Sequence, residues 1–311
     1  MTDQPYAESR LADVIRSLTG QFTLEVTPKE VRKNEGLLAE LLPAGTRVYT
    51  TFLPATPFSD TAAAARALIG QGMRPVPHLA ARSVADEAEL DRMVGELAGA
   101  GVEELLVIAG SLGSPVGSVT DSMQVLRSGV LGRHGIRRIG VAGHPEGNKD
   151  IDDPALASAL AEKNALAAET GTDMYLLTQF CFAPEPIIAW ERRIREAGNR
   201  LPVHVGLPGL TSPASLIKFG LACGVGPSLK VLRKQSGGVL KLATTPVYYP
   251  DQTLLGVARS AADDPASLFR SVHFFPFGAL RPTAEWVRKL QEGGFRVDAQ
   301  RDRVAVAEAG T

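Results

Sequence analysis

The chain has 311 residues, of which 44% are hydrophobic and 22% charged, and its formal net charge is −1 at pH 7. These proportions are ordinary for a globular protein that buries a sizeable core. Lysines and arginines are spread along the chain, so the sequence lacks the basic face that nucleic-acid binding requires. The composition therefore argues against a nucleic-acid-binding protein.

Cysteine usage and the N-terminal residues indicate a cellular compartment. Cys181 and Cys223 are the only cysteines, and they form neither a CxxC pair nor a cluster with histidines. So few thiols are typical of a reducing compartment. The first residues, MTDQPYAESRLADVIRSL, contain acids and no continuous apolar core, and no apolar run reaches the length of a membrane span. We expect a cytoplasmic protein without membrane association.

Short β-rich runs alternate with longer amphipathic stretches along nearly the whole sequence. Most of the runs are continuously apolar, which is typical of parallel strands buried on both faces. They recur at the spacing of roughly one βα unit, about 30 residues. The predicted strands are residues 22–26, 47–52, 74–80, 104–110, 137–143, 173–182, 202–208 and 271–277.

Helices are predicted between these strands and before the first of them. Residues 1–20 form a leading helix, and residues 85–101 place apolar side chains at helical spacing before a terminal glycine. Residues 152–171 begin with Asp and Pro and end with Gly, the usual asymmetry of helix ends. The long interval of residues 229–269 supplies extra helical material before the last strand, and residues 297–311 form a tail.

Eight such units without a linker predict one α/β domain over residues 1–311, a single (β/α)8 TIM barrel. An open doubly wound sheet is the alternative. A dinucleotide-binding sheet would carry GxGxxG after its first strand, whereas TPKE from Thr27 follows here. In a barrel, functional residues gather at the carboxyl ends of the strands. The residues at these ends are Glu25, Thr51, Phe52, His78, Gly110, Ser111, His144, Glu146, Gln179, Phe182, His204 and residues 273–277.

Four of the five histidines fall near these ends, which has two interpretations. One is a metal site with histidine and carboxylate ligands from different strands. The other is a polar pocket for a flat heterocyclic ligand, with aromatic walls and a few placed hydrogen-bonding groups. Neither HxH nor HExxH occurs, so the sequence favours the pocket and no metal is expected.

Two polar residues interrupt apolar strands. Gln179 lies in LLTQFCF, where a buried amide needs partners, so it binds either a ligand's ring edge or a neighbouring backbone group. Its position at a strand end favours the ligand. Glu25 lies between Leu24 and Val26, so its carboxyl points either into the barrel mouth or toward the helices. A carboxyl buried in the mouth would be suited to donating a proton near neutrality, whereas the alternative is an ion pair with a lysine or arginine.

Four elements together resemble a known family. FTLEVTPKE places Glu25 in the frame of the family strand F-E-F-F-P-P, and PHLAARS places His78 in the frame P-H-L-T. LLTQFCF matches I-T-Q-F-F-F at Gln179, and VHFFPFG matches F-H-F-Y at His273. In the order and spacing of these elements, over essentially its full length, the chain resembles the methylenetetrahydrofolate reductase family.

The resemblance implies that the protein reduces 5,10-methylenetetrahydrofolate to 5-methyltetrahydrofolate with NADH or NADPH, normally through bound FAD. It implies that Glu25 is the general acid that opens the five-membered ring to an iminium, and that Gln179 binds the pterin and the nicotinamide in turn. The substrate-binding residues are then Gln179, Phe182, Ser111 and Arg281. The cofactor-lining residues are Thr51, Phe52, His78, Gly110, Ser111, His144 and Asn164.

The departures from the family concern the flavin. The family's A-L-R-G-D becomes VIAGSLG, with Ala109 and Ser111 in place of Arg and Asp, and the Tyr of Y-P-E-V-H-P-E is missing before His144. Ala167 and Ala168 stand where the family has a basic pair near the flavin phosphates. Lost charge-assisted contacts lead us to expect FAD that is bound differently, weakly or not at all. The loop GSLGSPVGS either wraps a phosphate with backbone amides or is a plain connecting loop.

Two other functions stay open at this point: a folate-binding one-carbon transfer protein without redox activity, and a metal-dependent barrel lyase or hydrolase. The basic stretch with Lys230, Arg233 and Lys234 is interpreted as a solvated helix face, and the alternative is contact with a folate tail or a nicotinamide phosphate. The sequence decides neither the physiological direction, nor NADH against NADPH, nor whether the chain forms a homo-oligomer.

Overall fold

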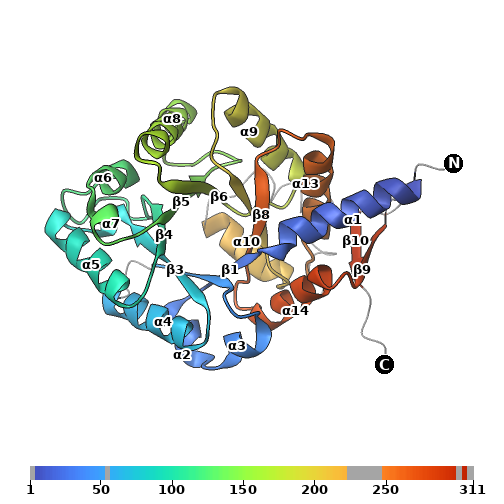
Figure 1. Ribbon diagram of the computed structural model, residues 1–311, viewed down its shortest axis with the longest axis horizontal. Helices are drawn as coiled ribbons and strands as arrows, with labels where there is room; N and C mark the ends of the chain where they lie inside the picture. The colour runs from blue at the N-terminus through green and yellow to red at the C-terminus, as the bar shows by residue number, and fades with distance from the viewer. Residues whose placement is uncertain (1–3, 53–56, 223–246, 299–302, 307–311) are drawn as a thin grey trace. The chain divides into compact units, whose positions relative to one another are not determined.

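Parallel strands β1 to β8 close into a barrel in chain order (Figure 1). The computed structural model describes residues 4–52, 57–222, 247–298 and 303–306. The predicted (β/α)8 barrel is therefore confirmed, and every predicted strand overlaps an observed one. The strands are β1 (Thr23–Val26), β2 (Arg47–Thr50), β3 (Arg74–Ala80), β4 (Glu104–Ile108), β5 (Arg138–Gly143), β6 (Asp173–Thr178), β7 (Val203–Pro208) and β8 (Phe269–Phe275).

Helices separate the strands as a barrel requires, and those predicted for residues 85–101 and 152–171 are α5 and α8. In the part of the chain that is described, no helix is long and apolar enough to cross a membrane. The helices are α1 (Gln4–Gly20), α2 (Pro28–Lys33), α3 (Leu37–Leu41), α4 (Phe58–Gly70), the 3-10 turn η1 (Ala81–Ser83), α5 (Glu87–Gly99), α6 (Ser122–Arg127), α7 (Val130–Arg133), α8 (Asp153–Thr170), α9 (Pro184–Glu196), α10 (Pro213–Ala222), α13 (Asp251–Asp263) and α14 (Leu280–Gln291).

The chain divides into two compact units, which we describe separately. The β1–β4 unit comprises Thr23–Ala142 and Pro154–Leu177, and the β7–β8 unit comprises Met1–Phe22, Gly143–Asp153 and Thr178–Thr311.

In the β1–β4 unit, a capping box begins α2 directly after β1. The hydroxyl of Thr27 accepts a hydrogen bond from the Glu30 amide at 3.1 Å, and the Glu30 carboxylate accepts one from the Thr27 amide at 2.7 Å. Pro28 occupies the first turn, where its missing N–H does no harm. The TPKE that replaces a glycine-rich turn is thus a helix start that ends β1 just beyond Glu25.

The interior of the β1–β4 unit combines apolar and polar side chains. Tyr49, Val76, Leu106, Tyr175 and Leu177 form one cluster, in which the two tyrosine hydroxyls hydrogen-bond to each other. Burial raises the pKa of both tyrosines, so both hydroxyls keep their protons. At the amino end of β4, the buried carboxylate of Glu104 accepts a hydrogen bond from Arg47 at 2.8 Å.

In the β7–β8 unit, the leading helix α1 packs on α13, α14 and β8, and Figure 1 shows it running beside α13 and α14. Phe22 and Trp286 both make edge contacts with Phe274, with ring centroids 6.3 Å and 6.0 Å away. Helix α13 is the extra helical material predicted before the last strand. Residues 230–234 lie outside the described residues.

Two short strands that the sequence did not predict, β9 (Phe295–Asp298) and β10 (Arg303–Val306), form an antiparallel pair. Strand β10 packs on α13 and α14. The tail expected from residue 297 onward thus contains the end of β9 and the whole of β10, and residues 299–302 and 307–311 are not described.

Gly140 makes room for the tyrosine pair, which gives a test of the interior packing. A Cβ at Gly140 would lie 2.6 Å from the Tyr175 hydroxyl and 2.9 Å from Leu106 Cδ1. We expect Gly140→Ala to lower the free energy of unfolding by about 1–3 kcal/mol, because the buried ring must move. Urea denaturation measures this. Gly99→Ala on α5, where a Cβ meets no atom within 4 Å, is the matched control and should not destabilise. Equal effects of the two substitutions would contradict this packing.

Candidate functional site

Strand register decides where Glu25 points. Glu25 pairs with Tyr49 on β2, and Tyr49 pairs with Val76 on β3. Since Tyr49 and Val76 belong to the interior cluster, Glu25 occupies the interior face rather than the helix face. His78, two residues after Val76, shares that face and pairs with Leu106 of the same cluster.

The carboxylate of Glu25 meets the imidazole of His78. Glu25 Oε2 lies 3.2 Å from His78 Nε2, and the two side chains are 16% and 10% exposed. Nε2 is buried and has no hydrogen-bond partner of good geometry, so the N–H does not point along the line to Oε2. The partner of Glu25 is thus a histidine instead of the lysine or arginine considered from the sequence.

A further polar atom near the carboxyl ends of these strands lacks a partner. The Thr51 amide donates to the Val26 carbonyl at 3.1 Å and continues the ladder between β1 and β2. The Thr51 hydroxyl is buried and makes no hydrogen bond to the described residues. Buried polar atoms are nearly always satisfied, so an unpaired one at this place fits contact with a ligand. Phe52 instead packs against Phe58 of α4, with ring centroids 6.2 Å apart.

The glycine-rich loop after β4 is pinned to the backbone after β3. Gly110 has φ +91, and a Cβ there would come within 3.0 Å of Ala80 Cβ, which explains why glycine is retained. Ser111 is exposed. The amides of Val116 and Ser118 donate to the carbonyls of Arg82 and Ala85 at 2.9 Å and 2.7 Å. These two amides are therefore not free to wrap a phosphate.

Arg82 is a structural residue that sequence reasoning missed. Its guanidinium donates to the carbonyls of Leu112 and Thr120, at 3.1 Å and 3.2 Å, and so spans the glycine-rich loop from the η1 turn. The sequence shows only that the segment around Arg82 is polar. This pattern does not predict that the side chain binds the carbonyl groups of a distant loop.

Helix α8 carries Asn164, the retained family position. Its amide donates to the Leu160 carbonyl within the helix at 2.9 Å. The neighbouring Lys163 is 8% exposed, and burial lowers the pKa of its ammonium, although the acids Asp121 and Glu162 oppose that shift. The one buried cation of this helix thus has acidic neighbours, and Ala167 and Ala168 add no charge.

In the β7–β8 unit, Gln179 follows β6 in the same alternation as Tyr175 and Leu177. Its amide N–H donates to the Gly143 carbonyl at 3.1 Å. The Thr178 hydroxyl donates to the Gln179 carbonyl and accepts from the Gly206 amide, both at 2.8 Å.

The backbone of Gln179 is therefore held on two sides. Its side-chain amide is half-buried and makes no hydrogen bond to the described residues. Among the described residues no backbone group is bonded to this amide, so its role as a ligand contact stays a prediction.

Aromatic rings gather around the ends of β6 and β8. Phe277 has φ 49, a conformation uncommon for a bulky residue, and its ring lies 5.0 Å from that of Phe180 and stacks on Phe219 at 4.4 Å. Cys181 is buried, which raises the pKa of its thiol and argues against a nucleophile. The cluster consists of Phe180, Phe182 and Leu216, with Ile217, Phe219, Tyr248, Phe275 and Phe277 packed against it.

The remaining predicted residues are more scattered. His204 and His273 are 5% and 0% exposed. His204 is the second residue of β7 and so lies near the amino end, where the sequence did not place it, whereas His273 is the fifth of seven residues in β8, as His78 is in β3. His144 is half-buried and begins a turn closed by the Gly147 amide. Arg281 lies on the first turn of α14, 3.7 Å from Glu285. Within the described residues, no group of three histidine, cysteine or acidic side chains is arranged to hold a metal.

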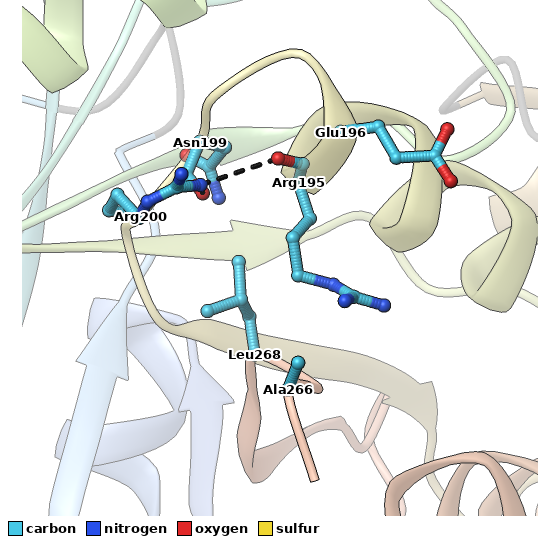
Figure 2. Close-up of a pocket in the computed structure, with 6 residues that line it drawn as sticks. All are labelled: Arg195, Glu196, Asn199, Arg200, Ala266 and Leu268. Atoms are coloured by element: carbon cyan, nitrogen blue, oxygen red, sulfur yellow. Dashed lines mark hydrogen bonds between the residues drawn. The ribbon is translucent and has the colours of Figure 1, made fainter. Parts of the chain in front are cut away.

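A cavity of about 420 Å³ lies at the opposite, amino ends of β7 and β8 (Figure 2). Arg195 is committed there to Glu191 at 2.9 Å and to Asp264 at 2.5 Å, and Arg200 donates to the Arg195 carbonyl at 3.3 Å. Barrel enzymes work at the carboxyl ends of their strands, so this cavity is a structural junction. It is lined by Arg195, Glu196, Asn199, Arg200, Ala266 and Leu268.

No protein-family model matches the chain. An uncharacterized protein from Clostridium thermocellum that binds two copies of 5-methyl-5,6,7,8-tetrahydrofolic acid has a similar fold, with a TM-score of 0.54, 8% identity, and coverage of 90% of this chain and 98% of that chain. An oxaloacetate acetylhydrolase aligns with a TM-score of 0.47, 14% identity, and coverage of 91% and 85%. The tryptophan synthase A-subunit of Pyrococcus furiosus aligns with a TM-score of 0.46 and 12% identity, and the alignment covers 88% of this chain and 97% of that chain. At these identities the likeness concerns the fold alone.

The buried Lys163 yields a prediction about stability. Its folded-state pKa is lowered, so between that value and the ordinary 10.5 the unfolded chain binds more protons than the folded one. Stability therefore rises with pH through this window. We expect Lys163→Met to be more stable than the parent at pH 7, and the gain to shrink as the pH approaches 10.5.

Thermal melting at pH 7 and pH 10 measures the difference. Lys149→Met is the matched control, because Lys149 is exposed and pairs only with Asp150 at 2.8 Å. A destabilised Lys163→Met at pH 7 would show that the ammonium has favourable partners instead.

Proposed function

We propose that this protein is an oxidoreductase that interconverts 5,10-methylenetetrahydrofolate and 5-methyltetrahydrofolate with NADH or NADPH, as the resemblance to the methylenetetrahydrofolate reductase family implies. We place this reaction in the cytoplasm, where the protein would use folate and nicotinamide. The observation that supports it best is the Glu25–His78 contact on the interior face, near the carboxyl ends of β1 and β3.

Two further observations agree with a folate ligand. The side-chain amide of Gln179, which makes no hydrogen bond to the described residues, offers the donor and acceptor that a pterin edge requires. The aromatic cluster around Phe180 and Phe182 provides flat apolar surface of the kind that binds aromatic rings. A barrel from Clostridium thermocellum that binds 5-methyltetrahydrofolate has a similar fold, so the architecture accommodates this class of ligand.

In the proposed reaction, Glu25 donates its proton to the folate nitrogen that leaves the one-carbon unit. The C–N bond breaks and an iminium forms, and hydride from the reduced nicotinamide then adds to its carbon. Low exposure of Glu25 favours this role, because a carboxyl shielded from water transfers its proton to the substrate rather than to solvent. Gln179 and Phe182 are proposed to hold the substrate, with Ser111 and Arg281 as further contacts.

The resemblance also implies FAD as an electron carrier. The residues of this chain fit the flavin ring but not the phosphates of FAD. The Thr51 hydroxyl and His78 Nε2 are unpaired polar atoms of the kind that a flavin or nicotinamide ring would satisfy. On the phosphate side, Ala167 and Ala168 carry no charge, Lys163 has acidic neighbours, and the amides of Val116 and Ser118 are engaged. Together, these residues do not fit a tightly held FAD, and in the proposed reaction the nicotinamide donates its hydride directly.

The visible absorption spectrum of the purified protein tests this reading of the flavin site. We expect well below one flavin per chain, because Ala167 and Ala168 replace the family's basic pair and the amides of Val116 and Ser118 are engaged. Nicotinamide oxidation with methylenetetrahydrofolate should proceed without added FAD. A stoichiometric flavin that survives gel filtration would contradict this.

The proposed function is tested by Glu25→Gln. We expect turnover of methylenetetrahydrofolate to fall at least roughly 10²-fold, because a positioned acid contributes about 10²–10⁴-fold. Binding of 5-methyltetrahydrofolate, measured by calorimetry, should be retained. Glu35→Gln is the control, since Glu35 is an exposed acid from the same part of the chain.

Three outcomes separate the candidate functions. Consumption of NADH or NADPH with methylenetetrahydrofolate supports the oxidoreductase. Folate binding without nicotinamide consumption in either direction would indicate the one-carbon transfer protein. Loss of activity on chelation would indicate the metal-dependent enzyme.

A further inference from the structure

The proposed reaction consumes one proton in each turnover, and Glu25 ends each turnover as a carboxylate. Another proton must reach it before the next ring opening. The Glu25 and His78 side chains are 16% and 10% exposed, so exchange with bulk water is restricted for both and a proton passes most directly from one to the other. The imidazole of His78 can both accept and donate a proton, and its Nε2 lies 3.2 Å from Glu25 Oε2.

The other ionisable groups of the β1–β4 unit that approach this pair cannot replace His78. The Tyr49 ring lies 6.2 Å from the His78 ring, but its hydroxyl is bonded to that of Tyr175 and burial raises the pKa of both. Glu104 is engaged by Arg47 at the amino end of its strand. Among the described residues of this unit, His78 is thus the one proton carrier in contact with Glu25.

The geometry allows transfer after a small motion. His78 Nε2 is buried and is not committed to another hydrogen bond. The distance of 3.2 Å is already within hydrogen-bond range, and only the direction is unfavourable. The terminal torsion of a glutamate side chain is broad, so rotation of the carboxylate can bring an oxygen onto the N–H line.

We propose that His78 returns the proton to Glu25 after each turnover, so that the acid of the reaction is a Glu25–His78 pair that holds one exchangeable proton. This inference rests on the proposed function. In the step, the Nε2–H bond of the imidazolium breaks and an O–H bond forms on Glu25. The neutral imidazole then takes a proton from solvent, and no electrons are exchanged. His78 acts through Glu25 and is therefore a positioning residue.

The substitution His78→Asn tests the proposal, because asparagine keeps a polar side chain of similar reach but carries no proton. We expect kcat to fall about 10-fold or more at pH 8 and much less at pH 6, where acid from solvent reloads Glu25 directly. Added imidazole should restore the rate at pH 8 in proportion to its concentration. Binding of 5-methyltetrahydrofolate should stay within about 3-fold, since the proton step follows binding.

His134→Asn is the matched control. It removes another histidine–carboxylate contact of similar length, the 3.1 Å pair with Asp91, which lies outside the barrel interior. This variant should keep the wild-type rate at every pH. The double variant with Glu25→Gln and His78→Asn should be no slower than Glu25→Gln alone, because both changes remove the same proton path.

The outcomes distinguish the two levels of the proposal. If the wild-type protein does not oxidise NADH or NADPH with methylenetetrahydrofolate, the proposed function itself fails. If wild type and Glu25→Gln behave as expected but His78→Asn loses rate equally at every pH and ignores imidazole, His78 has only a structural role. His78→Gln serves as the second variant where His78→Asn does not fold, with the same pH profile and imidazole response as its readouts.

Discussion

Successive side chains of a strand point to opposite faces, so in a closed parallel barrel every second residue of each strand faces the interior. In this chain several of these interior side chains are polar. In the β1–β4 unit these include Glu25, Tyr49, His78 and Tyr175. Burying such groups is unfavourable unless each finds a partner. Some of them do, since the two tyrosines bond to each other and Glu104 Oε2 accepts a hydrogen bond from Arg47.

Toward the carboxyl ends the same unit leaves polar atoms unsatisfied. The Thr51 hydroxyl and His78 Nε2 have no hydrogen-bond partner among the described residues. At the amino ends, Glu104 Oε1 and Arg138 Nε also make no hydrogen bond to the described residues, but they lie 3.7 Å apart as an ion pair. The Thr51 hydroxyl and His78 Nε2 lie near the carboxyl ends, where barrel enzymes bind their ligands, so these two atoms fit contact with a ligand.

The sequence predicted the strands well because continuous apolar runs identify buried parallel strands with little ambiguity. It could not decide the direction of Glu25, because that depends on the register of Glu25 with Tyr49, which is a property of two strands together. The pairing of β9 with β10 was missed for the same reason, since neither short run is apolar enough to predict a strand alone. Arg82 and Lys163 were missed as structural features because their burial and bonding depend on loops and helices distant in sequence.

The resemblance implies that Glu25 is the acid and that His78 lines the cofactor, and the structure adds a contact of 3.2 Å between these two side chains. Motif matching also left the glycine-rich loop available to a phosphate, whereas Arg82 and Ala85 occupy two of its amides. A motif shows which residue types recur in a family. It does not show which of their hydrogen-bonding groups are already bonded within the protein and therefore cannot bind a ligand.

A shared proton has a consequence for the direction of the proposed reaction. The group that protonates the folate nitrogen in ring opening must remove that proton in ring closure, because forward and reverse paths cross the same transition state. The Glu25–His78 pair therefore serves reduction and oxidation equally, the histidine loading the acid in one direction and unloading it in the other. In the proposed reaction the direction is then set by the ratio of reduced to oxidised nicotinamide together with the ratio of methylene- to methyltetrahydrofolate, and no residue of the acid pair needs to change for either direction.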